Sequence, residues 1–141
     1  MLNLTIHTDG GSRGNPGPAA CGVTITGDDG KTYYAQGKYL GVTTNNEAEY
    51  EAFLDSVLWL SEFVKANEVA SLTWTLDSKL VVEQLNRKWK IKEPRLQLKA
   101  QNCWKLLSTI GVSYSIKHVL RHLNADADAL VNQALDAQAG K

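Results

Sequence analysis

Residues 8–18 read Thr-Asp-Gly-Gly-Ser-Arg-Gly-Asn-Pro-Gly-Pro, and the rest of the chain is organised around this stretch. Before it, Leu2, Leu4 and Ile6 alternate with polar residues, a period of two that predicts a strand ending at Asp9. The glycines that follow permit positive φ angles and a close approach of the backbone to a ligand. A tight turn with a solvated carboxylate is the alternative interpretation of the same residues.

The composition is typical of one soluble globular domain, which we expect to span residues 1–141. The 15 basic and 15 acidic residues cancel, so the net charge predicts no polyanionic partner. The distribution is uneven, however, because the stretch 79–99 carries seven basic and two acidic residues, a local balance of 7 − 2 = +5.

Cys21 and Cys103 are far apart and fit neither a disulfide framework nor a zinc spacing, which predicts two reduced thiols. The N-terminal residues lack the basic start and continuous apolar run of a signal peptide, and no segment is long and apolar enough to span a bilayer. We therefore expect a cytoplasmic protein without membrane contact, and a monomer.

The periodicity along the chain predicts alternating strands and helices. Further strands are expected over residues 19–26, 31–40, 72–76 and 112–118, and helices over 44–64, 78–85, 94–110 and from Asn124 onward, with Asn124 as N-cap. This order predicts an α/β fold with a five-stranded mixed sheet, three antiparallel and then two parallel strands, flanked by helices.

Four carboxylates occupy related places in this plan. Asp9 and Asp77 each end a strand, and Glu49 and Asp128 lie near helix starts. If the strand before Asp77 docks parallel beside the first, neighbouring carboxyl ends lie roughly 4.8 Å apart, and ligands of open α/β sheets gather there. Clustered carboxylates repel one another unless cations offset their charge.

All-oxygen ligation favours Mg²⁺ or Mn²⁺ over zinc, and two such ions can hydrolyse a phosphodiester. The alternatives for single residues are simpler. Glu49 also suits the helix dipole, Asp126 is interpreted as capping charge, and Asp28 and Asp29 as turn formers.

The segments 8–18, 44–50, 77–85 and 124–132 resemble, in family order, the type 1 ribonuclease H family, and more closely its compact archaeal-like branch. The resemblance implies a ribonuclease H-like fold and a metal-dependent endonuclease that cuts the RNA strand of RNA/DNA hybrids, leaving 5′-phosphate and 3′-hydroxyl ends. It implies Mg²⁺ or Mn²⁺, two ions with substrate bound, on the catalytic residues Asp9, Glu49, Asp77 and Asp128.

The resemblance also implies contacts with the hybrid. Asn15, Asn45, Asn46 and Gln84 match positions that touch the minor groove, where 2′-hydroxyls report RNA identity. Their alternatives are turn, cap and exposed helix residues. The glycine-rich segment and the basic loop after Gln84 complete the predicted contact set, with Gly10, Gly11, Ser12, Arg13, Arg87, Lys88 and Lys90.

Two features depart from many members of that family. The loop before the last acidic residue is short, so His122 is the predicted auxiliary residue for proton transfer or product release, with Arg121 and His118 as rivals and a solvated His122 as the alternative. The region after Gln84 leaves little room for an inserted basic helix, and we predict none.

Two other functions remain open at this level. A non-catalytic domain that binds hybrids would keep the fold, although all four acidic positions are filled. Another nuclease or an integrase-like enzyme would use the same scaffold, because a scaffold does not fix chemistry.

Overall fold

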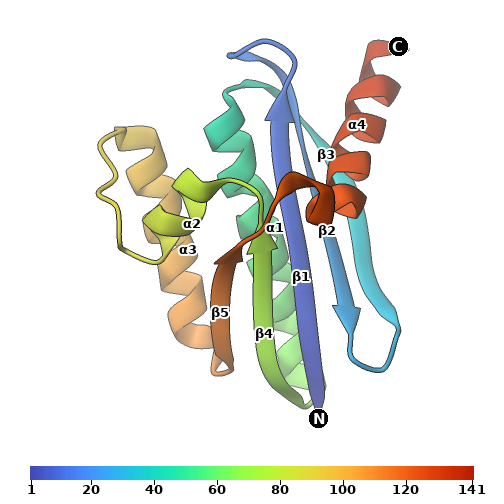
Figure 1. Ribbon diagram of the computed structural model, residues 1–141, viewed down its shortest axis with the longest axis vertical. Helices are drawn as coiled ribbons and strands as arrows, with labels where there is room; N and C mark the ends of the chain where they lie inside the picture. The colour runs from blue at the N-terminus through green and yellow to red at the C-terminus, as the bar shows by residue number, and fades with distance from the viewer.

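Strand β1 (Leu2–Ser12) is the centre of a five-stranded sheet in the computed structural model, which describes residues 1–141. On one side it pairs antiparallel with β2 (Gly17–Gly27), which pairs antiparallel with β3 (Thr32–Thr43). On the other side, β4 (Val69–Leu76) and β5 (Ser113–His118) are added in parallel, giving the order β3-β2-β1-β4-β5 (Figure 1). The predicted mixed sheet is confirmed.

The first strand does not end at Asp9, where the sequence pattern predicted its end. β1 stays paired with β2 as far as Ser12, whereas β4 ends opposite Thr8. Gly10 and Gly11 are therefore strand residues and not a loop, whereas Gly14, with a φ of 92°, lies in the turn before β2. A Cβ added to Gly10 would lie 2.2 Å from the carbonyl carbon of Ala48, so glycine is required because a helix approaches the strand closely.

That helix is α1 (Asn45–Ala66), which begins where the sequence predicted. Thr44 is the N-cap, and its side chain and that of Glu47 form a capping box that satisfies free N–H groups of the first turn. Ala48, Ala52 and other small or apolar side chains of α1 are buried. The helix can therefore lie against β1 and bring its first turns to the point where β4 ends.

Two further helices pack next to α1. The short α2 (Lys79–Leu85) follows β4 directly, with Ser78 as its N-cap. α3 (Pro94–Ile110) begins with its predicted proline and ends at Gly111, which has a left-handed φ of 71°. The core, with Trp74, Tyr50 and Phe53 among its largest fully buried side chains, lies between the sheet and the layer of α1, α2 and α3.

The last helix, α4 (Ala125–Ala139), lies on the opposite face, over β2 and β3 (Figure 1). It lies very close to the sheet, because a Cβ on Gly22 would lie 2.4 Å from the carbonyl oxygen of Ala127 and one on Gly37 2.6 Å from that of Leu130. Gly22 and Gly37 pair in the ladder, so the two glycines together form the floor on which α4 rests.

Asn124 stands at the predicted N-cap position of α4, but its side chain does not cap the helix. A 3-10 turn, η1 (Arg121–Asn124), precedes the helix, and the side chain of Asn124 makes no capping hydrogen bond. Its amide bonds to β1 and to His7 instead, because the chain enters α4 through η1 and the side chain faces the sheet. None of the helices is both long and apolar enough to cross a membrane. Cys21 and Cys103 are buried and unbonded.

Candidate metal centre

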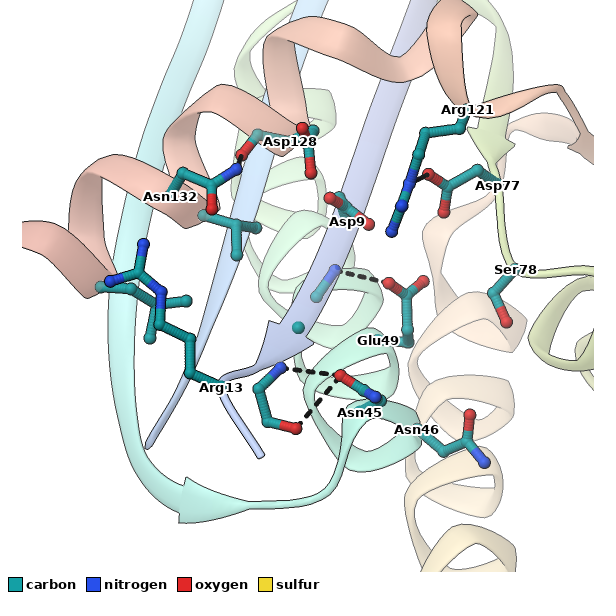
Figure 2. A pocket seen from close by; sticks show the side chains of 15 residues that line it. Asp9, Arg13, Asn45, Asn46, Glu49, Asp77, Ser78, Arg121, Asp128 and Asn132 are labelled. Carbon is teal, nitrogen blue, oxygen red and sulfur yellow. Dashed lines mark hydrogen bonds and ion pairs between the residues drawn. The ribbon is translucent and has the colours of Figure 1, made fainter. Parts of the chain in front are cut away.

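Three carboxylates from distant parts of the chain meet beside the centre of the sheet. Asp9 lies within β1, Asp77 follows the last residue of β4, and Glu49 comes from the first turns of α1. One oxygen of each lies within 4.8 Å of the others, and Figure 2 shows the three groups facing one another. They meet because β4 ends opposite Thr8, which leaves the edge of β1 open from Asp9 onward.

The backbone of β1 holds Glu49 in place. The Gly10 N–H, which has no partner on β4, donates to Glu49 Oε1 at 2.6 Å. Glu49 is 5% exposed, and its Oε2 is buried without a hydrogen-bond partner. Asp77 Oδ2 is likewise buried and has no hydrogen bond. Buried carboxylate oxygens without partners are costly unless a cation compensates them, and this all-oxygen set fits Mg²⁺ or Mn²⁺.

The electrostatics are those of a site with excess negative charge. Burial raises the pKa of Asp9 to about 7, and the nearby charges of Asp77 and Asp128 act in the same direction. Burial, followed by the charge of Asp9, raises the pKa of Glu49 well above its usual range. The pKa of Asp77 is raised by burial, against which the guanidinium of Arg121 acts. These shifts indicate charges that a divalent cation would stabilise.

Asp128 stands slightly apart from the three. It lies in the first turn of α4 and borders the same cavity, but it is not part of the cluster within 4.8 Å. In Figure 2 its side chain lies across the cavity from Glu49. The structure thus places all four predicted metal ligands around one cavity of about 520 Å³. Three of them have oxygens within 4.8 Å of one another, and the fourth, Asp128, lies at the cavity wall.

Part of the predicted contact set lines this cavity, namely Gly10, Gly11, Ser12, Arg13, Asn45 and Asn46. Asn45 Oδ1 accepts hydrogen bonds from the Ser12 N–H at 2.7 Å and from its hydroxyl at 3.1 Å. These bonds tie the start of α1 to the end of β1. Arg13 lines one side of the cavity, and its guanidinium pairs with Asp136 at 2.6 Å.

The side chains of Asn15 and Gln84 each accept a hydrogen bond from another residue of the protein. Asn15 Oδ1 accepts from the Asn45 N–H at 3.1 Å, which satisfies a free donor at the start of α1. Gln84 is 5% exposed, and its Oε1 accepts from the Tyr50 hydroxyl at 2.8 Å. Neither residue borders the acidic cavity, so the structure does not bring them to the carboxylates as it does Asn45 and Asn46.

The predicted basic contacts lie on a separate surface, which we call the basic ledge and define as Arg87, Lys88, Trp89 and Lys90, with Trp104 beneath. The guanidinium of Arg87, a residue with a positive φ of 61°, stacks 3.9 Å from the centre of the Trp104 ring. Gln84, Arg87, Trp89 and Lys90 line one shallow depression, and Lys88 is exposed beside them. No basic helix is inserted between α2 and α3.

His122, the predicted auxiliary residue, is exposed in η1 and does not border the cavity. Arg121, its rival, does. Its guanidinium points between Asp77 and Asp9 in Figure 2, with Nε 3.9 Å from Asp77 Oδ2. His118 ends β5 and also lies outside the cavity. The structure therefore places Arg121, and not His122, at the cavity, because the turn of η1 directs neighbouring side chains to different sides.

The sequence analysis missed several cavity residues, which are Ser78, Val131, Asn132 and Leu135. Asn132 had a detectable signal, because it lies four residues after Asp128 and thus on the same helical face. Its amide donates to the Asp128 backbone carbonyl at 3.1 Å. The sequence pattern predicts Val131 and Leu135 to be core residues, and only the position of α4 places them at the cavity wall.

A mixed sheet in the order β3-β2-β1-β4-β5, with acidic groups gathered beside its central strand, defines a ribonuclease H-like protein. Comparison with known proteins agrees. The sequence model of the family described as "Reverse transcriptase-like" matches residues 7–134.

Named relatives narrow this class. The chain is 40% identical over 144 residues to "Bifunctional protein Rv2228c" of Mycobacterium tuberculosis, covering 98% of this chain and 37% of that protein. It is 39% identical over 130 residues to "Ribonuclease HI" of Halobacterium salinarum, covering 92% of this chain and 63% of that protein. The chain thus spans from about a third to just under two thirds of these relatives' own lengths.

A solved structure gives the match in three dimensions. LC11-RNase H1 in complex with an RNA/DNA hybrid superposes with a TM-score of 0.89 at 38% identity, covering 96% of this chain and 99% of that one. The chain belongs to the type 1 ribonuclease H family.

Proposed function

We propose that the protein is a metal-dependent endoribonuclease that hydrolyses the RNA strand of RNA/DNA hybrids and leaves 5′-phosphate and 3′-hydroxyl ends. The observation that carries this proposal is the set of three carboxylates within 4.8 Å, two of them with buried oxygens that accept no hydrogen bond. Such a set suits no uncharged ligand. The likeness to a protein solved with a hybrid supplies the substrate class.

Asp9, Glu49 and Asp77 would hold Mg²⁺ or Mn²⁺, with Asp128 completing the set when substrate brings a second ion. Bound there, such ions lower the pKa of a water and stabilise the leaving oxygen of the phosphodiester. The protein holds these carboxylates in place before a metal ion binds. The Gly10 N–H holds one oxygen of Glu49, and this leaves Oε2 directed at the cluster.

The wall of the cavity offers amide and hydroxyl groups to the RNA strand. The Asn46 side chain makes no hydrogen bond within the protein and is partly exposed at the start of α1, beside the carboxylates. An amide presents both a donor and acceptors, which is what a 2′-hydroxyl needs. Asn45 has its oxygen engaged by Ser12, so its amide nitrogen is the group left for the substrate.

We propose that Arg121 takes the auxiliary role first predicted for His122. Its guanidinium lies at the cavity mouth, where the charge of the scissile phosphate would sit. Lacking an acceptor, it would stabilise charge or assist product release and would not shuttle a proton. The basic ledge is proposed to contact phosphates of the same hybrid away from the cut. The expected cytoplasmic location and monomeric state stay predictions.

The test is cleavage of an end-labelled RNA/DNA hybrid with Mg²⁺, with Mn²⁺ and with EDTA, beside duplex DNA and duplex RNA of the same sequence. We expect metal-dependent cutting of the RNA strand of the hybrid alone, with fragments that a 3′-end ligation reaction accepts as hydroxyl ends. Cutting in EDTA, or equal cutting of duplex DNA, would contradict the proposal.

A further inference from the structure

A partly buried polar network lies next to Asp9, at the edge of the acidic site. His7, two residues before Asp9 in β1, faces Thr75 across the β1–β4 ladder. Its Nδ1 lies 2.8 Å from Thr75 Oγ1 and 3.0 Å from Asn124 Oδ1. Asn124 is 1% exposed and Thr75 is 8% exposed. The network therefore joins β1, β4 and the end of η1 in a place largely closed to water.

The direction of each hydrogen bond follows from the partners. Asn124 Nδ2 donates to the Thr8 carbonyl at 2.8 Å, so its Oδ1 is turned toward His7 and can only accept. The Thr75 hydroxyl donates to the Ile6 carbonyl at 3.1 Å, so it offers a lone pair to His7. Both partners of Nδ1 are acceptors, and Nδ1 must therefore carry the hydrogen. His7 thus fixes which way the Asn124 amide points.

The Asn124 amide is the only side chain of η1 that is buried. It lies where η1 passes into α4, with Arg121 three residues before it and Asp128 four residues after it, and both of these border the acidic cavity. The bond to the Thr8 carbonyl attaches this junction to the backbone immediately before Asp9. One side chain thus connects the two sides of the cavity.

We propose that His7 is a positioning residue: by orienting Asn124 it fixes the segment that carries Arg121 and Asp128 over Asp9. Without the Nδ1 hydrogen, the Asn124 oxygen faces no donor, the amide rotates, and its bond to Thr8 is lost. The α4 junction then shifts relative to the carboxylates. The activity part of this inference rests on the proposed function, whereas the amide orientation does not.

The first test measures the amide itself in metal-free protein. The side-chain amide protons of Asn124 are followed by nuclear magnetic resonance in wild type, His7→Leu and His7→Asn. Asparagine at position 7 places an N–H where Nδ1 was, so it serves as the conservative rescue. We expect slow hydrogen exchange of this amide in wild type and His7→Asn, and fast exchange in His7→Leu. Slow exchange in all three proteins would overturn the proposal.

The second test measures cleavage of the hybrid. We expect His7→Leu to lower kcat roughly tenfold with KM changed less than about twofold, because misplaced catalytic groups slow chemistry more than binding. His7→Asn should recover most of the loss. The matched control is Thr5→Leu, two residues earlier on the same face of β1, where no side-chain hydrogen bond is made. Equal losses in Thr5→Leu and His7→Leu would overturn the proposal by showing general destabilisation.

A milder variant covers the case in which His7→Leu does not fold. His7→Phe keeps an aromatic ring in place and removes the Nδ1 hydrogen, and His7→Asn is its hydrogen-bonding counterpart. We expect a faster-exchanging Asn124 amide and a lower kcat in His7→Phe than in His7→Asn, and identical behaviour of the two variants would overturn the proposal. If wild type fails to cut any hybrid, the proposed function fails, and the exchange measurement still decides the role of His7.

Discussion

The acidic cavity and the basic ledge both carry charges predicted to serve the same substrate, yet they are built in opposite ways. In the cavity, Glu49 and Asp77 have buried oxygens without hydrogen bonds, and burial raises the pKa of each. On the ledge, Lys88 and Lys90 are exposed, and Arg87 is held only by stacking on Trp104. Fixed, partly desolvated charge suits chemistry, whereas solvated charge suits adjustable contact with a backbone.

This difference leads to an ordered set of expectations. Substitutions in the cavity should change kcat strongly and the salt dependence little, and substitutions on the ledge should do the reverse.

Asp9→Asn should reduce kcat at least about 100-fold, because removal of a central metal ligand removes the charge stabilisation that the ions provide. The variant should fold as well as wild type or better, since it relieves repulsion among the carboxylates. Steady-state cleavage of labelled hybrid and thermal denaturation measure the two effects. Asp126→Asn, which alters an exposed carboxylate in the same region, is the control and should keep full activity. Normal turnover by Asp9→Asn would show that the acidic cavity is not the catalytic site.

Arg121→Ala should lower kcat roughly tenfold, because a cation facing the scissile phosphate is lost from a partly exposed position. His122→Ala, one residue further along η1, should change kcat less than about twofold, since His122 is exposed outside the cavity. Parallel kinetics on the two variants decide between the residues. The reverse ranking would return the auxiliary role to His122.

The double variant Lys88→Ala/Lys90→Ala should raise KM for the hybrid a few-fold, leave kcat nearly unchanged and reduce the slope of log affinity against log salt by up to about 2 units, one for each lost phosphate contact. Binding to a catalytically inactive Asp9→Asn background, measured between low and high salt, isolates this effect. Lys105→Ala, an exposed lysine on α3, is the control. If the slope of log affinity against log salt does not change, the basic ledge is a solvated loop and does not contact the hybrid.

The metal-free protein should lose stability as pH rises from about 4 to 7. Burial raises the pKa of Asp9 to about 7, so in this window the folded state keeps a proton that the unfolded chain has released. Stability from this group is therefore fully present at low pH and is lost as pH passes through the folded pKa. Glu49 shifts in the same direction.

Thermal denaturation in EDTA at several pH values measures this loss. Asp9→Asn should melt roughly 4 °C above wild type at pH 8 and show a smaller difference at pH 5. Added Mg²⁺ should close the gap at pH 8 by stabilising wild type alone. A difference between the two proteins that does not vary with pH would mean that the Asp9 carboxyl is not held by its neighbours as described.

Periodicity and capping were enough to place most of the elements. Thr44 and Glu47 marked the start of α1, and Pro94 and Gly111 marked both ends of α3, because caps and breakers act within one turn of the chain. The end of β1 was misjudged. Its glycines looked like a loop, and only the close approach of α1 to Gly10 explains why they are strand residues.

The sequence by itself determined which acidic residues gather around the cavity, since acidic groups at strand ends and helix starts can be recognised from short local patterns. The tertiary structure alone decided how they are arranged: that Asp128 stands at the cavity wall, that Arg121 and not His122 faces it, and that Asn124 bonds to β1 and not to its own helix. These facts depend on contacts between segments about 40 to 120 residues apart, such as Gly10 with Glu49 and Thr8 with Asn124. Distances of that kind are set by packing, which no local pattern encodes.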